Sequence, residues 1–338
     1  MSVFIGVDLG GTKVAVARLS GRQLSSSSTE PTVLSGAGAL MDQLVSLISS
    51  VRGSVELDAV GIGVPSVVEF ETGRVVSSVN VPLADVPLRE VLGERLGVPV
   101  FVDNDATVAA LAEAHDDDLR LVAHNLVMLT VGTGLGGGLV LGGRIYRGAT
   151  GGAGEIGHTL VALDLDGGVP APVRFPQPGS LESVAAGHAL DRLASNAAAS
   201  AEAQSPLGRL HAEGKPVLGA DAVAAALDGD AAAGRIVSVW AERVGIGVAN
   251  AINTFDPEEV VIGGGAARAG DLLLEPAKRV AAGYVLPGLG SRTTVRIARH
   301  GVRAGVLGAA LLAQHESDAE ALGGRTGPEA TSTLEVPR

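Results

Sequence analysis

Two glycine-rich turns carry polar residues whose types and spacing fit phosphate chemistry. The first turn lies between the apolar runs 4–9 and 14–17. Its candidate residues are Asp8, Gly10, Gly11, Thr12 and Lys13. An ordinary two-residue hairpin needs only a pair such as Gly-Gly for its turn, so the carboxylate, the hydroxyl and the cation are extra. A phosphate group would account for the hydroxyl and the cation, and a carboxylate at this place can hold Mg²⁺ through water.

The second turn repeats the first within residues 130–138, where glycines again separate two apolar runs. Its candidate residues are Thr133, Gly134 and Gly136. Glycines have no side chain, so backbone N–H groups can approach a phosphate closely. Each hairpin alone is better explained as plain structure. Two such turns facing each other, one of them preceded by Asp8, favour a polyphosphate held from both sides.

The run Asp103-Asn104-Asp105 stands between a buried strand at 98–102 and a helix that starts at Ala106. In open α/β sheets, ligands bind beyond the carboxyl ends of such strands. Asp105 can cap the helix, which explains one polar residue of the three. It can also accept a proton from a substrate hydroxyl, as the general base of a phosphoryl transfer. The two roles are compatible, and the sequence leaves both open.

Three further segments could belong to a functional site, but none of them indicates one by itself. Glu155 and His158 stand three residues apart in a glycine-flanked loop, where a metal-binding helix is not expected. Ser180 and Glu182 precede an Ala-rich helix and fit helix-start chemistry without any function. The glycines at 263–265, Gly264 and Gly265 among them, follow a short strand and could let a flat ring lie against the backbone.

The elements that must position these residues alternate between strand and helix, which predicts an α/β protein with a mixed sheet. Strands are expected in hairpins at 3–19 and 125–147 and at 60–64, 98–102 and 259–262. Helices are expected at 37–51, 86–96, 106–115, 181–199, 220–227, 231–253, 270–282 and 304–315. Residues 25–36 are expected to form a Ser-rich loop or a poor strand, and the Pro-rich stretch 159–178 a loop. The low hydrophobicity of residues 316–338 predicts a disordered tail.

The composition bounds the function. The chain has 338 residues, of which 46% are hydrophobic, with 48 glycines and a net charge of −12. The negative charge disfavours nucleic acid and anionic membranes as partners, because both select a basic face. The sequence has no cysteine, which excludes disulfides and thiolate metal sites and fits the cytoplasm. No signal peptide is expected, because Asp8 and Lys13 interrupt the first apolar stretch.

These pieces, in this order, resemble the ROK family of bacterial sugar kinases, repressors and open reading frames, from about residue 3 to residue 314. The family has the bilobed actin/hexokinase/Hsp70 ATPase fold, with ribonuclease H-like lobes around a central cleft. The resemblance implies an N-terminal lobe of residues 1–115 plus about 302–315, and a C-terminal lobe of residues 116–301. It also implies a homodimer.

The resemblance assigns roles to the candidate residues. ATP with its Mg²⁺ would lie across the two glycine turns and the 256–265 segment, and Asp105 would be the catalytic base. The implied contacts to sugar hydroxyls come from Asn80, Asn104, Glu155, His158 and Glu182. A site built to pair each hydroxyl rejects analogues that lack it.

The sequence departs from the family on the sugar side of this site. The family commonly has a zinc site of one histidine and three cysteines, but this chain has no cysteine, and Ser180 replaces one of them. The family's Pro-Gly after the third strand is Pro65-Ser66, and the tryptophan often found after Asn80 is missing. We therefore expect no zinc site, and the reaction type is better defined than the substrate.

The sequence thus predicts an ATP- and Mg²⁺-dependent kinase that phosphorylates a primary hydroxyl of a hexose, with glucose as first choice. One alternative is a kinase of a C7-cyclitol or an amino sugar. Another is a non-catalytic, sugar-sensing transcriptional regulator, which the net charge and the retained Asp105 disfavour. The donor, ATP or polyphosphate, stays open.

Overall fold

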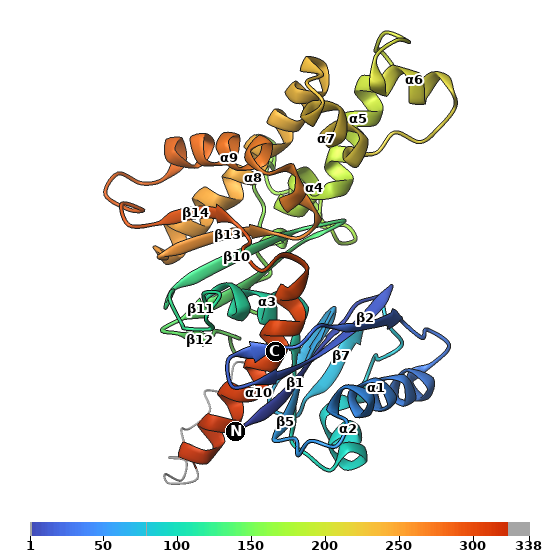
Figure 1. The fold of residues 1–338 in the computed structure, drawn as a ribbon. Helices are drawn as coiled ribbons and strands as arrows, with labels where there is room; N and C mark the ends of the chain where they lie inside the picture. The colour runs from blue at the N-terminus through green and yellow to red at the C-terminus, as the bar shows by residue number, and fades with distance from the viewer. Residues whose placement is uncertain (1, 79, 324–338) are drawn as a thin grey trace.

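The computed structural model describes residues 2–78 and 80–323 and contains two mixed sheets built on the same plan (Figure 1). The first sheet has the order β3-β2-β1-β5-β9, with β4 also paired to β2. The bounds are β1 Val3–Leu9, β2 Lys13–Ser20, β3 Gln23–Leu24, β4 Ser28–Pro31, β5 Ala59–Val64 and β9 Val100–Asn104. β1 and β2 form the first predicted hairpin, and β5 and β9 continue the sheet in parallel.

The second sheet repeats this pattern with the order β12-β11-β10-β13-β14. The bounds are β10 Leu126–Val131, β11 Leu135–Leu141, β12 Arg144–Ile145, β13 Glu259–Gly263 and β14 Thr294–Ile297. β10 and β11 are the second predicted hairpin, and β13 and β14 extend it in parallel. In each sheet the glycine turn therefore ends the hairpin at the edge where a parallel strand also ends. A small sheet of β6 (Ser66–Glu69), β7 (Arg74–Ser78) and β8 (Val86–Pro87) is added to these two.

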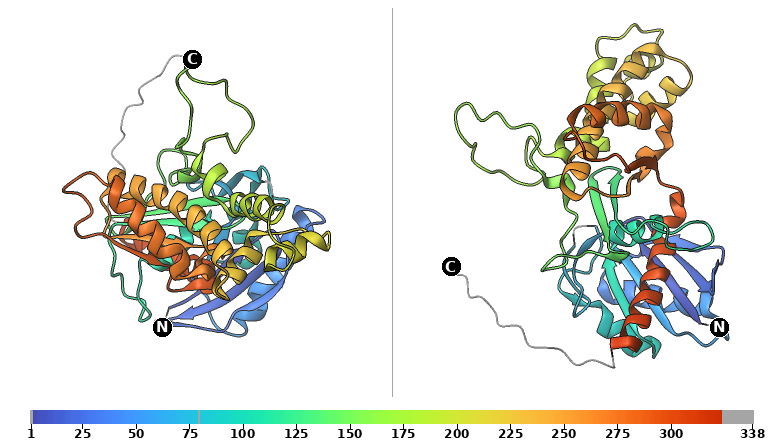
Figure 2. Two further views of the ribbon diagram at one scale, coloured as in Figure 1. Left: turned by 90° about the horizontal axis from the view of Figure 1, so that it is seen from above. Right: turned by 90° about the vertical axis from the view of Figure 1, so that its left-hand side faces the viewer.

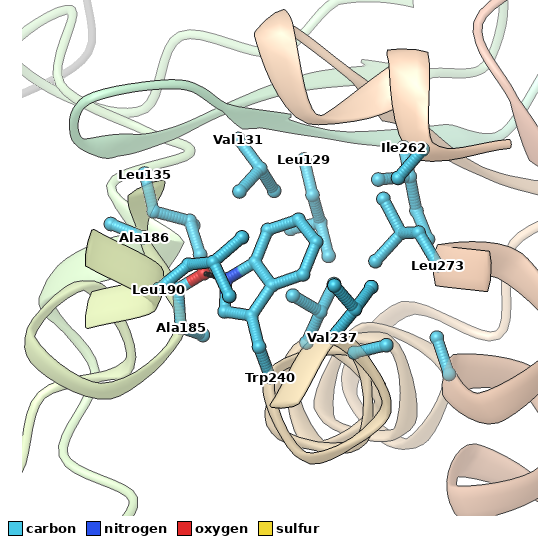
Figure 3. Close-up of a cluster of buried hydrophobic side chains, with 14 of the residues drawn as sticks. Leu129, Val131, Leu135, Ala185, Ala186, Leu190, Val237, Trp240, Ile262 and Leu273 are labelled. Atoms are coloured by element: carbon cyan, nitrogen blue, oxygen red, sulfur yellow. Dashed lines mark hydrogen bonds between the residues drawn. The ribbon is translucent and has the colours of Figure 1, made fainter. Parts of the chain in front are cut away.

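The helices form separate apolar cores with each sheet. α1 (Ala37–Arg52) and α2 (Leu88–Leu96) pack on the first sheet. The second sheet packs against a group of helices centred on α8 (Ala231–Phe255), whose Trp240 is buried and donates from Nε1 to the Ala185 carbonyl oxygen at 2.7 Å (Figure 3). The other helices of this group are α4 Leu181–Ala185, α5 Gly187–Ala198, α6 Pro206–Ala212, α7 Gly219–Leu227 and α9 Asp271–Tyr284.

A third core contains α3 (Asp105–Glu113) and α10 (Ala304–Gly323) together with residues of both sheets. Small residues let these elements approach closely. A Cβ at Gly61 of β5 would stand 1.8 Å from the Ala309 carbonyl oxygen of α10, and one at Gly308 would stand 1.8 Å from the Val108 carbonyl oxygen of α3. α3 is thus held in place between α10 and the second hairpin, β10–β11.

The structure differs from the sequence prediction in several places. The predicted disordered tail is wrong for residues 316–323, which continue α10, and residues 324–338 lie outside the described part of the chain. The predicted helix 181–199 is divided at Ala186 into α4 and α5. The sequence analysis missed α6, β14 and the β6–β8 sheet. The lobe boundaries at 115/116 and 301/302 stay predictions.

The loop 159–178 contains neither helix nor extended strand, as predicted, and projects from the rest of the molecule in both views of Figure 2. An isolated bridge between Leu160 and Ser180 closes its base. Among the described residues, no helix combines the length and hydropathy that crossing a membrane would require.

Candidate active site

At the junction of β9 and α3, two neighbouring residues have different roles. Asn104 is the N-cap: its Oδ1 accepts from the backbone N of Ala106 at 2.9 Å and of Thr107 at 3.3 Å. The expectation that Asp105 caps a helix starting at Ala106 is therefore wrong, because Asp105 is itself the first helical residue. Its Oδ1 does accept from the Ala106 backbone N at 2.8 Å. The helix is capped without Asp105, whose second oxygen is left for other chemistry.

The Asp105 carboxyl has the proton affinity of a base that works near neutral pH. Its pKa is raised to about 6, mainly by burial and also by the negative charges of Asp8 and Glu155, while the Ala106 hydrogen bond opposes the change. A general base is most effective when its pKa lies close to the working pH. The charges of two carboxylates from distant segments, both predicted site residues, thus reach the Asp105 carboxyl.

The first glycine turn is closed by a bond from the Gly10 backbone N to the Lys13 carbonyl oxygen, at 2.9 Å. The Gly10 carbonyl oxygen accepts from Thr32 Oγ1 at 2.6 Å. Thr12 and Lys13 are exposed at the tip of the turn. A Cβ at Gly11 would stand 3.2 Å from both the Cβ and the carbonyl oxygen of Asn80, so this predicted sugar residue lies against the turn.

Asp8 lies at the end of β1 against the start of α10. A Cβ at Gly305 would stand 2.5 Å from the Asp8 Oδ2, so the glycine leaves room around the carboxylate. Burial raises the Asp8 pKa, and the Lys13 charge opposes that change. A carboxylate oxygen in such a place is a suitable partner for Mg²⁺ or for its water shell, so the residues present fit this ion.

The second glycine turn is packed from both sides. A Cβ at Gly136 would stand 2.8 Å from Thr130 Oγ1 and 3.6 Å from the Ala106 Cβ, which sets the turn beside the start of α3. Glu182 Oε2 accepts from the Leu135 backbone N at 2.8 Å. The start of α5 meets the same turn, because the Gly187 backbone N donates to the Gly132 carbonyl oxygen at 2.7 Å. Glu182, a predicted sugar residue, therefore also braces the turn.

A cavity of about 510 Å³ opens beside this turn. Gly132 and Thr133 form part of its wall, and Gly265 after β13 forms another. Gly264 has φ +77° and leaves no room for a Cβ, which would stand 2.5 Å from the Val131 carbonyl oxygen. Small apolar residues of α7 complete the wall: Ala220, Val223 and Ala224. The mostly apolar wall and the adjoining glycine turn suit a flat heterocycle joined to phosphates.

Most of this cavity was not predicted from the sequence. The glycines were predicted, but the wall also includes Asp191 of α5 and Arg268, three residues after Gly265. His188, which lies next to the cavity, bonds through Nδ1 to the Thr133 carbonyl oxygen at 2.7 Å. Ala-rich helices have no residue pattern that is specific for a binding site, so their place in the cavity wall is visible only in the folded structure.

Two of the remaining predicted sugar residues, Glu155 and His158, lie in one loop, and the third, Asn104, ends β9. Glu155 and His158 face each other, with 3.7 Å between Oε2 and Nε2. The His158 ring meets the Phe175 ring edge-on at 5.3 Å between centroids. Its Nδ1 is buried and has no hydrogen-bond partner in the described part of the chain. The Asn104 amide is used by the cap and by a 3.3 Å bond from Nδ2 to the Ser66 carbonyl oxygen.

A zinc ion does not fit the residues around His158. The chain has no cysteine, and residues 2–78 and 80–323 contain no group of three or more His, Asp or Glu placed to hold a metal. Structural zinc sites need four protein ligands. The ring of Phe175 lies against the imidazole.

Comparison with known proteins gives one consistent result. The ROK family model matches residues 4–316. A glucokinase of Halalkalibacterium halodurans is 34% identical over 334 residues, which cover 96% of this chain and 98% of the relative. An N-acetyl-D-glucosamine kinase of Aliivibrio fischeri is 31% identical over 92% of this chain and 99% of the relative. A xylose repressor of Caldicellulosiruptor bescii is 33% identical over 65% of this chain but over only 53% of its own length.

Solved structures agree with the sequence relatives. A ROK family glucokinase from Streptomyces griseus, in complex with glucose and AMPPNP, matches with a TM-score of 0.74 at 30% identity, over 93% of this chain and 100% of that one. A ROK hexokinase from Thermus thermophilus matches with a TM-score of 0.72 at 35% identity, over 94% and 99%. The actin/hexokinase-like ATPase fold predicted from the sequence is thereby confirmed.

Proposed function

The chain belongs to the ROK family and is a sugar kinase, and from this premise we propose that it transfers the γ-phosphoryl group of ATP to a primary hydroxyl of a hexose, with glucose as the first substrate. One observation carries the proposal. Asp105, whose pKa is raised to about 6, stands at the start of a helix that packs against a glycine-rich hairpin. A base and a phosphate-binding turn are thus adjacent, as phosphoryl transfer to a hydroxyl needs.

In the proposed reaction the sugar oxygen attacks the γ-phosphorus in line as the bond to the ADP oxygen breaks. The Asp105 carboxylate accepts the hydroxyl proton as the new P–O bond forms. Most of the rate enhancement in such transfers comes from positioning and charge neutralisation. A base with a pKa of about 6 is ionised at pH 7 and is ready to take the proton.

The nucleotide occupies the two turns and the cavity in this proposal. The phosphates lie at Gly10–Lys13 and at Thr133–Gly136, while the base and ribose take the cavity beside Gly264 and Gly265. Asp8 would hold the Mg²⁺ ion, which would supply charge neutralisation during the transfer. Backbone N–H groups of the turns supply the remaining contacts.

The sugar lies between the Asp105 segment and the Glu155–His158 loop. Glu155 and His158 are proposed hydroxyl partners, together with Asn80 and the free donor of the Asn104 amide. Glu182 joins them while it also braces the second turn through Leu135. An amino sugar is the second candidate substrate, favoured by the N-acetyl-D-glucosamine kinase among the relatives.

A substrate panel tests the proposal. The purified chain is mixed with ATP and Mg²⁺, or with polyphosphate, and with glucose, N-acetylglucosamine or a C7-cyclitol, and ADP release and ³¹P NMR spectra of the product are recorded. Glucose with ATP should give the highest kcat/KM and a phosphate on the primary hydroxyl. A higher kcat/KM with another acceptor would identify that acceptor as the substrate in place of glucose. Sugar binding without transfer to any acceptor would instead indicate a sugar-sensing protein.

A further inference from the structure

Arg147 is a largely buried cation that no role described so far uses. It follows β12, and its Nε lies 2.7 Å from the Asp103 Oδ2, with exposed side-chain fractions of 18% and 3%. Its Nη2 lies 2.7 Å from the Glu316 Oε1 on α10. The guanidinium carbon stands 3.4 Å from the Phe70 ring centroid. One side chain thus joins the segment after β12 to β9, α10 and the loop after β6.

Asp103 connects this cation to the reacting centre. Its Oδ1 accepts from the Asn104 backbone N at 2.9 Å while its Oδ2 receives Arg147. The carboxylate therefore fixes the peptide that leads into the helix cap and Asp105. A buried carboxylate with both oxygens bound in this way has little freedom to move.

The Arg147 main chain connects to the sugar loop. Its carbonyl oxygen accepts from the Ala153 backbone N at 3.0 Å and closes the turn 147–153. Within this turn, a Cβ at Gly151 would stand 2.2 Å from the Val68 carbonyl oxygen, so the turn is seated on β6. The next residues, Gly154 and Glu155, lead directly to His158.

We infer that Arg147 is a positioning residue for the transfer step, because it fixes the position of the Asp103–Asp105 segment relative to the Glu155–His158 loop. This inference rests on the proposed function of Asp105 and the loop. The two groups of sugar contacts come from segments about 50 residues apart in sequence. The Arg147 guanidinium binds Asp103 of the first segment, and its carbonyl oxygen binds the backbone N of Ala153, two residues before Glu155.

Arg147→Lys tests this role with a matched control. Lysine keeps a positive charge beside Asp103 but loses the planar group that reaches two carboxylates and stacks on Phe70. Arg296→Lys is the control, since Arg296 is equally buried, with an exposed fraction of 17%, and pairs with Glu113 and Glu259 away from the site. Melting temperatures of both variants are measured beside kcat and both KM values.

We expect Arg147→Lys to lower kcat about 10- to 100-fold and to raise the KM for the sugar, because small misplacements of reacting groups have effects of this size. The KM for ATP should change less than about twofold. Arg296→Lys should lower the melting temperature similarly but keep kcat within about threefold. Glu316→Gln, a milder change at the more exposed partner, should lower kcat in the same direction if Arg147→Lys folds poorly.

Hydrogen exchange gives a readout that does not depend on activity. Arg147→Lys should accelerate amide exchange in peptides covering both 104–107 and 154–158, whereas Arg296→Lys should not. Unchanged exchange in these two segments, or equal loss of kcat in the two lysine variants, overturns the inference. If the unaltered chain transfers phosphate to no sugar, the proposed function fails, and the exchange experiment still decides whether Arg147 couples the two segments.

Discussion

At the scale of single residues, the β9–α3 junction explains why an amide, Asn104, and a carboxylate, Asp105, are neighbours in the sequence. Asn104 satisfies the first free N–H groups of α3, which every helix start must do for its own stability. Asp105 is then not needed as the cap. Its partial burial next to other carboxylates gives it a raised pKa, which suits proton transfer better than structure.

The raised pKa predicts the pH dependence of the reaction. The base must be ionised to accept a proton, so kcat/KM should fall about tenfold for each pH unit below about 6 and level off above that value. Initial rates from pH 4.5 to 8.5, in buffers of constant ionic strength, measure this profile. A rate that is flat down to pH 5 would remove Asp105 from the role of base.

The same pKa affects stability. Because the pKa of Asp105 lies above its ordinary value, the folded state binds the proton more tightly than the unfolded chain. The contribution of this group therefore falls as the pH rises through about 4 to 6, and the ionised carboxylate destabilises the folded protein at pH 8. Asp105→Asn should then melt no lower than the unaltered protein at pH 8, and any advantage should vanish near pH 4.

At the scale of elements, close packing of α10 on β1, β5 and α3 fixes the reacting parts. These contacts rest on glycines, since a Cβ at Gly6 would stand 2.0 Å from the Val306 carbonyl oxygen and one at Gly61 1.8 Å from that of Ala309. Any larger residue must separate the helix from the sheet. The hairpins then lose their common support.

A pair of alanine variants measures this packing. Gly61→Ala should lower the free energy of unfolding by at least about 2–3 kcal/mol, because the added methyl group overlaps α10. Gly234→Ala, in the α8 helix with nothing within 4 Å of the new Cβ, should instead raise it by about 0.5–1 kcal/mol. Urea unfolding of both variants provides the comparison. Equal effects of the two substitutions would contradict the close contact of α10 with β5.

The loop 159–178 has no cysteine, and the described residues contain no group of His, Asp or Glu side chains placed to hold a metal. We therefore expect its prolines, which fix φ, and the contact of Phe175 with His158 to order the loop. A strong zinc chelator in excess Mg²⁺ should therefore change neither the melting temperature nor kcat. His158→Ala should raise the KM for the sugar with little effect on melting. A stoichiometric zinc atom per chain, found by elemental analysis, would contradict this account.

At the scale of the whole molecule, the sequence predicts the parts whose chemistry is local. Both glycine hairpins, the strand before Asp105 and the Ser180 cap, whose Oγ accepts from the Ser183 backbone N at 3.2 Å, follow from short-range patterns. The extent of α10 was not predicted, because residues 316–320 are mostly polar and because part of their support, the pair of Glu316 with Arg147, comes from a distant part of the chain. The role of Arg147 was not predicted for the same reason, since its partners lie 44 and 169 residues away in the sequence.

The central claim is that Asp105 takes the sugar proton in a phosphoryl transfer, and Asp105→Asn tests it most directly. Asparagine keeps the size of the side chain, and the Asn104 cap is untouched. We expect kcat to fall about 10²- to 10⁴-fold. The Kd for the sugar, measured by calorimetry, should change less than about threefold, and the protein should melt as stably as before. A folded Asp105→Asn protein that binds sugar and keeps kcat within about tenfold of the unaltered chain would contradict the account.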